Sequence, residues 1–356
     1  MPEIIRQWIP TLSRLRFLVQ ILTLFLTVWG SVVVGHYAAD KISTALPALS
    51  CAYDKEHGGY CVLIPLQHQM HHRVGEALVK AQQITQQVLL PTVIAMGTFL
   101  IFFFVLGKAF CAWVCPLGTV QEWLNKIGRR LGRPQQQLSA KGIRRARPVK
   151  WLILLGMVFI VPILAGAGAA PHALGNPYCD ICPSRIVTTL LTANTDELAL
   201  KTNSGWSMAL SAIADILVGF MLVAALAMRQ PFCRICPMLA MNAVFRHASL
   251  TRLVKIEHEK CEKCGVCTKA CPMDIPEIHH KHGLKAFNED CTLCGRCAEF
   301  CPDDGVIQVK FGPWPVFSSS REYYKKRVKQ ESPEGMPKPI KLVRKSALPP
   351  PVADAT

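Results

Sequence analysis

The sequence predicts a membrane α-helical domain with four transmembrane helices, followed by a small α+β domain that is rich in cysteine. Three features carry this prediction. Of the 356 residues 51% are hydrophobic, the apolar residues gather in four long runs, and half of the 16 cysteines stand in two matching quartets. A chain divided in this way is expected to place its runs in lipid and to fold its quartets around metal.

Four apolar runs are long enough to cross a bilayer, which takes about 20 residues. They cover residues 17–39, 88–107, 151–170 and 206–228. The first run is interpreted as an anchor that stays in the protein, because it is longer than the apolar part of a signal peptide. The fourth contains Asp215, and an acid inside a membrane is a candidate quinone or proton site. A structural acid that faces the other helices fits equally well.

The distribution of Lys and Arg predicts how the chain is oriented. The segment 108–150 carries ten Lys or Arg and one acid, whereas 40–87 carries four of each and 171–205 carries two bases and three acids. Because basic residues gather in cytoplasmic loops, we expect a multi-pass protein of the inner (cytoplasmic) membrane with both termini in the cytoplasm. The loops 40–87 and 171–205 are then expected outside. The net charge of +16 reflects this topology and contact with membrane lipid, not nucleic-acid binding.

Composition divides the chain into three parts. Residues 1–250 are predicted to form the membrane domain, with cysteine pairs at both faces, and residues 251–312 the cysteine-rich domain. Residues 313–356 are basic and rich in proline, with few large apolar side chains. Such a composition buries too little apolar surface to fold alone, so this tail is expected to be disordered or bound to a partner.

The two quartets repeat the spacing C-x2-C-x2-C-x3-C-P, which is typical of bacterial ferredoxins with two [4Fe–4S] clusters. In this pattern the fourth cysteine of each run ligates the other cluster. The predicted ligands are Cys261, Cys264, Cys267 and Cys301 for the first cluster, and Cys291, Cys294, Cys297 and Cys271 for the second. Zinc is the alternative, since C-x2-C pairs also bind zinc, but two matching quartets that each end in Cys-Pro favour iron–sulfur clusters.

Two further pairs lie beside the second and fourth apolar runs. Each follows a phenylalanine and precedes a proline: Cys111 and Cys115, and Cys233 and Cys236. Four thiols at the cytoplasmic membrane face predict one shared [4Fe–4S] cluster, the third of the chain. Two unlinked reduced pairs or a zinc site are the alternatives.

The remaining cysteines are Cys51, Cys61, Cys179 and Cys182. The predicted topology places them outside, where disulfides persist, so Cys51–Cys61 and Cys179–Cys182 disulfides are one interpretation. The other is a fourth cluster, because YCDICPSR is similar to FCRICPML at Cys233. The same outer region carries His36, His57, His68, His71 and His72. Histidines in a polar loop usually face solvent, and a haem or metal role is their alternative.

The segment CAWVCPLGTVQEW, the later C-x2-C-P and the doubled quartet resemble the membrane polyferredoxins of the NapH, NosR and CcoG type, with YccM-like proteins among them. The resemblance covers residues 85–310. It implies electron transfer between the quinone pool or a cytoplasmic donor and a partner oxidoreductase. The chain departs from the family in having C-x2-C-P at Cys233 where C-x3-C-P is usual. It also lacks the flavin-binding domain of NosR, and its Cys179/Cys182 pair has no counterpart in the NapH pattern.

The predicted function is therefore a membrane-bound relay of electrons, with an oxidoreductase, which could be periplasmic, or a cytochrome subunit as partner. No arrangement of side chains indicates a catalytic nucleophile or an acid–base pair, although the chain could oxidise quinol as a quinol dehydrogenase-type component. An assembly factor that reduces a metal or thiol, and a cluster-based redox sensor, are the alternatives. A 20-residue helix is about 30 Å long, so clusters at opposite faces need a quinone or haem between them, or cysteine turns that dip into the bundle.

Overall fold

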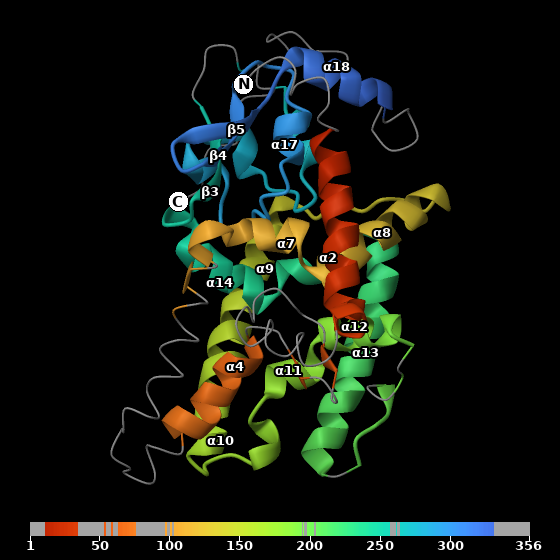
Figure 1. Ribbon diagram of the computed structural model, residues 1–356, viewed down its shortest axis with the longest axis vertical. Helices are drawn as coiled ribbons and strands as arrows, with labels where there is room; N and C mark the ends of the chain where they lie inside the picture. Colours follow the sequence, from red (N-terminus) through yellow and green to blue (C-terminus); the bar gives the residue numbers. More distant parts are fainter. Residues whose placement is uncertain are drawn as a thin grey trace.

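The computed structural model describes residues 11–34, 53–54, 58–59, 63–75, 97, 100–101, 103–193, 195, 198–202, 204–256, 261 and 264–330. Figure 1 shows an elongated arrangement, with a three-stranded sheet toward one end and the long helices toward the other. The chain order of the helical part is α2 (Leu12–Val34), α4 (Leu63–His68), η1 (Gln69–Gly75), η2 (Gly107–Ala109), α7 (Phe110–Trp113), α8 (Pro116–Arg130), α9 (Ala140–Ile153), η3 (Leu154–Ile160), α10 (Val161–Gly166), η4 (His172–Leu174), α11 (Pro177–Ile181), α12 (Pro183–Leu191), α13 (Gly205–Ala227), η6 (Phe232–Arg234), α14 (Pro237–Val244) and η7 (Phe245–His247).

Two described helices are long and apolar enough to cross a membrane. One is the continuous stretch Ala140–Gly166, formed by α9, η3 and α10, and the other is α13; both have a mean hydropathy of 2.3. Large apolar side chains on them, among them Leu152 and Ile216, are about 70% exposed, which suggests association with lipid. Of the other two expected spans, 17–39 is described as far as Val34, within α2. Most of 88–107 lies outside the described residues.

The segment between the two long helices turns back into the bundle. After α10 the chain passes through η4 and returns toward the middle of the molecule as α11 and α12 before α13 begins (Figure 1). The sequence predicts an outer loop at 171–205, but the side chains of Tyr178, Ile186 and Val187 are buried in the same core as those of α13. The apolar faces of these two short helices explain the difference, because they gain more from packing on α13 than from exposure.

The cysteine-rich part is a small α+β unit. Its sheet has the antiparallel order β3 (Thr251–Lys255), β4 (Ile307–Phe311) and β5 (Trp314–Ser318). Short helices connect the strands or follow them: α15 (Val266–Ala270), α16 (Glu277–His280), η8 (Leu284–Ala286), α17 (Arg296–Glu299) and α18 (Arg321–Gln330). β5 and α18 thus lie in the segment 313–356, which the sequence predicts to be a tail. Apart from this unit and the helices, a short ribbon pairs β1 (Tyr53–Asp54) with β2 (Gly58–Gly59).

Gly265 and Gly295 occupy equivalent places in the two quartets. Each glycine follows the second cysteine of its quartet and caps the start of a short α-helix. The glycine itself has a left-handed backbone conformation, with φ +74° at Gly265 and +76° at Gly295. A residue with a Cβ adopts this conformation at a cost, whereas glycine does so freely. The repeated glycine therefore turns the chain in the same way in both quartets.

Buried ion pairs fasten the α+β unit to the helices. The Arg147 guanidinium lies 2.7 Å from Glu277 and 2.6 Å from Asp290, and Lys150 pairs with the same Asp290. Arg234 pairs with Asp274 at 2.6 Å. Arg147 and Lys150, which belong to the basic segment 108–150, thus also pair with acidic residues of the cysteine-rich unit.

Candidate metal centre

A cavity of about 50 Å³, called the bundle cavity below, lies among the helices of the bundle, and Thr292 of the α+β unit also lines it. Apolar side chains such as Leu63, Phe110 and Leu117 form much of its wall. Five cysteines from three segments also line it: Cys111, Cys115, Cys182, Cys233 and Cys236. The structure thus brings together the four thiols that the sequence assigns to one site and adds Cys182, which the sequence places at the opposite face.

The three Cys-Pro turns share one local geometry. Cys115, Cys182 and Cys236 each cap a helix with an extended backbone, at ψ between 118° and 125°, and the next residue is proline at the first helical position. Proline suits that position because its fixed φ fits the helix and its missing N–H is not needed there. The sequence C-P therefore sets a sharp turn at each of these cysteines.

Two buried glutamines contact the first cysteine of a C-x2-C-P segment in the same way. Gln121 accepts a hydrogen bond from the Phe232 amide at 3.1 Å, and its Nε2 lies 3.6 Å from Cys233 Sγ. Gln67 accepts from the Tyr178 amide at 3.3 Å, and its Nε2 lies 2.9 Å from Cys179 Sγ. In both cases 112 residues separate the glutamine from its cysteine.

The matching contacts of Gln67 and Gln121 indicate an internal duplication. Gln121 is the sixth residue after Cys115, and Gln67 is the sixth residue after Cys61. The spacing C-x5-Q was visible in the sequence, but its partner in each case lies more than a hundred residues away. The similarity of the two C-x2-C-P segments therefore extends to the buried polar group that supports each of them.

Burial governs the protonation of the bundle thiols. Burial, and then the charge of Cys115, raise the pKa of Cys233 to about 12. Burial also raises the pKa values of Cys111 and Cys236 well above that of a free thiol, and neighbouring cysteines add to both shifts. Without a cation these groups stay neutral, whereas metal binding favours the thiolate. All fourteen cysteines that the structure describes are free thiols, so the donor set and its apolar enclosure fit an iron–sulfur cluster.

The outer cysteines are described in part. Cys179 and Cys182 are free thiols, so the structure does not contain the disulfide between them that was one interpretation. The Tyr178 hydroxyl lies 3.9 Å from Cys182 Sγ and 3.9 Å from Cys236 Sγ. Cys51 and Cys61 lie outside the described residues.

The fourth cysteine of each quartet feels the charge of cysteines in the other quartet. Burial raises the pKa of Cys271, and the charges of Cys294 and Cys291 add to the shift. Burial raises the pKa of Cys301 to about 12, with Cys267 among its neighbours. The fourth cysteine of each quartet is therefore close to the other quartet. The assignment of individual ligands stays a prediction.

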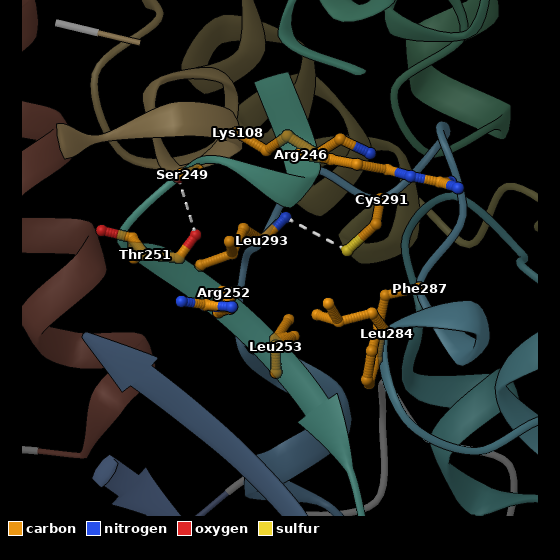
Figure 2. Close-up of a pocket in the computed structure, with 10 residues that line it drawn as sticks. All are labelled: Lys108, Arg246, Ser249, Thr251, Arg252, Leu253, Leu284, Phe287, Cys291 and Leu293. Atoms are coloured by element: carbon orange, nitrogen blue, oxygen red, sulfur yellow. Dashed lines mark hydrogen bonds between the residues drawn. The ribbon is translucent and has the colours of Figure 1, made fainter. Parts of the chain in front are cut away.

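The bundle cavity and the second quartet are close neighbours. Thr292, the residue after Cys291, lines the bundle cavity, and the Trp113 indole donates to the Leu293 carbonyl at 3.2 Å. Beside Cys291 lies a second cavity of about 30 Å³, which Lys108 and Arg246 also line (Figure 2).

Lys108 stands between the two groups of thiols. Its Nζ donates to the Asn288 carbonyl at 2.6 Å. Burial lowers its pKa to about 8, while Cys291 and Cys111 act in the opposite direction. Burial raises the pKa values of both these thiols, and the positive charge of Lys108 partly offsets that rise at each of them.

Asp215 lies on α13 and is not among the residues that line the cysteine cavity. Its Oδ1 makes no hydrogen bond to any part of the chain that the structure describes. A quinone or proton role for Asp215 therefore stays a prediction.

Comparison with known proteins agrees with these sites. The family model for a 4Fe-4S binding domain matches residues 88–134 and 212–254, which contain the two membrane-proximal pairs. The model for a 4Fe-4S dicluster domain matches residues 253–302, which contain both quartets. No solved structure matches the chain. The two family models define a 4Fe–4S-binding protein of ferredoxin type.

Similar proteins of known name show to which group of 4Fe–4S-binding proteins the chain is related. YccM of Escherichia coli is 31% identical over 52% of this chain, the regulatory protein NosR of Pseudomonas aeruginosa 29% over 50%, and the ferredoxin-type protein NapH of Haemophilus influenzae 27% over 51%. The chain spans 49%, 21% and 53% of these relatives, respectively. With the resemblance seen in the motifs, these matches show that the chain is a homologue of the NapH/NosR-type polyferredoxins.

Proposed function

We propose that the chain is a membrane-bound electron-transfer protein that relays electrons between the quinone pool or a cytoplasmic donor and a partner oxidoreductase. The observation that carries this proposal is that the cavity lined by the bundle cysteines is also lined by Thr292, the residue after Cys291 of the second quartet, and that these cysteines are free thiols. [4Fe–4S] clusters, when bound, supply one-electron transfer at potentials that the surrounding charge and hydrogen bonds adjust.

Three cluster sites follow from this proposal. Two are the crossed sets of the quartets, and the third is formed by Cys111, Cys115, Cys233 and Cys236. The cavity, its apolar wall and the raised pKa values of Cys111, Cys233 and Cys236 support the third set, because a bound cation would stabilise the thiolates that burial otherwise disfavours.

A fourth site is proposed at Cys179 and Cys182, with Cys51 and Cys61 as the predicted additional ligands. The contact of Gln67 with Cys179 supports this fourth site, because it repeats the contact of Gln121 with Cys233. Tyr178 lies between this site and the third. The cysteine turns thus dip into the bundle, and the path need not cross the full length of a transmembrane helix.

The chain's own residues position, insulate and tune the sites. Gln67 and Gln121 donate toward cysteine sulfur, Lys108 supplies positive charge, and apolar side chains exclude water. We assign no catalytic residue to the chain. The topology, with both termini in the cytoplasm, belongs to the same proposal.

Metal analysis of the full-length chain, purified anaerobically in detergent, tests this function. We expect about 12 irons with an equal amount of acid-labile sulfide from three sites, or about 16 from four. The reduced protein should be oxidised by a soluble quinone analogue. Zinc without sulfide, or clusters that do not exchange electrons with any quinone analogue or donor ferredoxin, would overturn the proposal.

Replacing Lys108 by Met is expected to make the midpoint potentials of the adjacent clusters more negative. A reduced cluster carries more negative charge, and the buried lysine stabilises it by about 1–2 kcal/mol, as for unit charges about 10 Å apart at an effective dielectric of about 20. An EPR-monitored redox titration measures the shift. Lys326→Met, at an exposed lysine on α18, is the control and should leave every potential unchanged. Unchanged potentials in Lys108→Met would contradict the role of this charge.

A further inference from the structure

Three histidines that belong to none of the cysteine sites gather where the chain leaves α10. His71 and His72 lie in η1, and His172 begins η4. One nitrogen from each ring lies within 4.8 Å of the other two. His71 Nδ1 is 3.2 Å from His72 Nε2, and the His71 and His172 rings are 4.7 Å apart. Figure 1 shows α10 at the end of the molecule away from the three-stranded sheet.

The packing around His71 makes this cluster a built site. His71 is 2% exposed, whereas His172 is open to solvent. A Cβ on Gly175 would come within 2.9 Å of His71 Nδ1, and one on Gly166 would overlap the His71 carbonyl. At Gly75 a Cβ would meet the Gly166 Cα at 2.7 Å. Gly75 and Gly166 thus let η1 pack against the end of α10, and Gly175 leaves room for the buried His71 ring.

The backbone of η1 is unusual as well. Residues Gln69–Gly75 form a π-helix, a geometry that is rare and frequently marks functional sites. It places two consecutive histidines with ring centres 4.2 Å apart. The sequence interpretation of His71 and His72 as loop histidines facing solvent therefore does not hold for His71.

We propose that His71, His72 and His172 bind one divalent transition-metal ion of the Zn²⁺ class. Imidazole nitrogen suits such ions, whereas Ca²⁺ and Mg²⁺ require oxygen ligands. Zinc–nitrogen bonds of about 2.0–2.1 Å require ligand nitrogens about 3.3 Å apart in a tetrahedral site. The His71–His72 separation already meets this, and a small rotation of the exposed His172 ring would complete the set.

The proposed site has three imidazoles and one open coordination position. A water molecule or a substrate atom usually occupies such a position in zinc sites that react, whereas structural zinc sites are closed by a fourth protein ligand. Because the three histidines are not among the cluster ligands proposed above, zinc binding at this site can be measured separately from the iron–sulfur content.

Equilibrium dialysis against Zn²⁺ alone tests the site, with the full-length holoprotein in detergent and an affinity tag that contains no histidine. We expect one bound zinc per chain beyond the iron–sulfur content, and at least a ten-fold loss of affinity in His172→Ala. His172 is exposed, so this substitution leaves the buried packing intact. Gly175→Val, which would push a side chain into His71, should weaken binding in the same way.

The double variant His279→Ala/His280→Ala is the matched control. These two residues are also adjacent, and their ring centres are 4.4 Å apart, but they belong to no group of three within the described residues. Zinc affinity should be unchanged in this variant, and iron and sulfide should be unchanged in all variants. Equal zinc binding by the wild type and His172→Ala, or none by the wild type, would overturn the proposal even if the clusters are present.

Discussion

Replacing Cys233 by Ser is expected to remove about four irons and the matching sulfide from the purified chain, and to stop electron transfer beyond the quartets. Cys233 lines the bundle cavity with Cys111, Cys115 and Cys236, and its Sγ is the atom to which Gln121 donates. A serine hydroxyl is a poor substitute for a thiolate on iron. Iron and sulfide assays with EPR of the reduced protein measure the loss.

A double variant tests whether Cys111 and Cys233 ligate the same cluster. Cys111→Ser should remove the same irons, and the double variant should lose no more than either single variant, because both residues belong to one cluster. EPR signals of the two quartet clusters should persist in all three proteins. Losses that add in the double variant would show that the two pairs bind metal separately.

Local spacing is the reason that the quartets could be predicted from the sequence. Within each quartet the ligands lie at most ten residues apart, and Gly295 in the second supplies the left-handed turn that the spacing needs. The same holds for Cys115 and Cys236, where C-P sets both the turn and the start of a helix. The assignment of Cys271 to the cluster of the second quartet stays a prediction from the repeat.

Long-range pairing is what the sequence could not reveal. Counting charges predicts that 40–87 and 171–205 lie on the same side of the membrane, but it does not reveal that Gln67 contacts Cys179, 112 positions along the chain. The π-helix that brings His71 to His172 is invisible to any test of hydrophobic periodicity. Lys150 was counted as a topology signal, although its side chain is fully buried against Asp290.

Replacing Asp290 by Asn is expected to weaken the docking of the α+β unit on the helical bundle, because Asp290 pairs with both Arg147 and Lys150. Asp290 accepts from Arg147 Nε at 2.6 Å and from Lys150 Nζ. When Asp290 loses its charge, the nearest remaining carboxylate to the buried Lys150 in the described structure is that of Glu289, at 3.8 Å. Removing one partner of a buried pair typically costs about 3–5 kcal/mol, since the other charge stays buried without compensation.

Asparagine has nearly the shape of aspartate, so the loop before Cys291 should keep its fold and the quartets their irons. The measurable result is faster proteolysis between the two parts and a lower urea midpoint, with slower reduction of the bundle cluster by the quartet clusters. Glu322→Gln is the control, because Glu322 pairs with Lys326 on an exposed face of α18, where ion pairs contribute little. If Asp290→Asn matches this control in all three measurements, the buried pair does not hold the two parts together. The Arg234–Asp274 ion pair and the hydrogen bond from the Trp113 indole to the Leu293 carbonyl would then have to hold the two parts together.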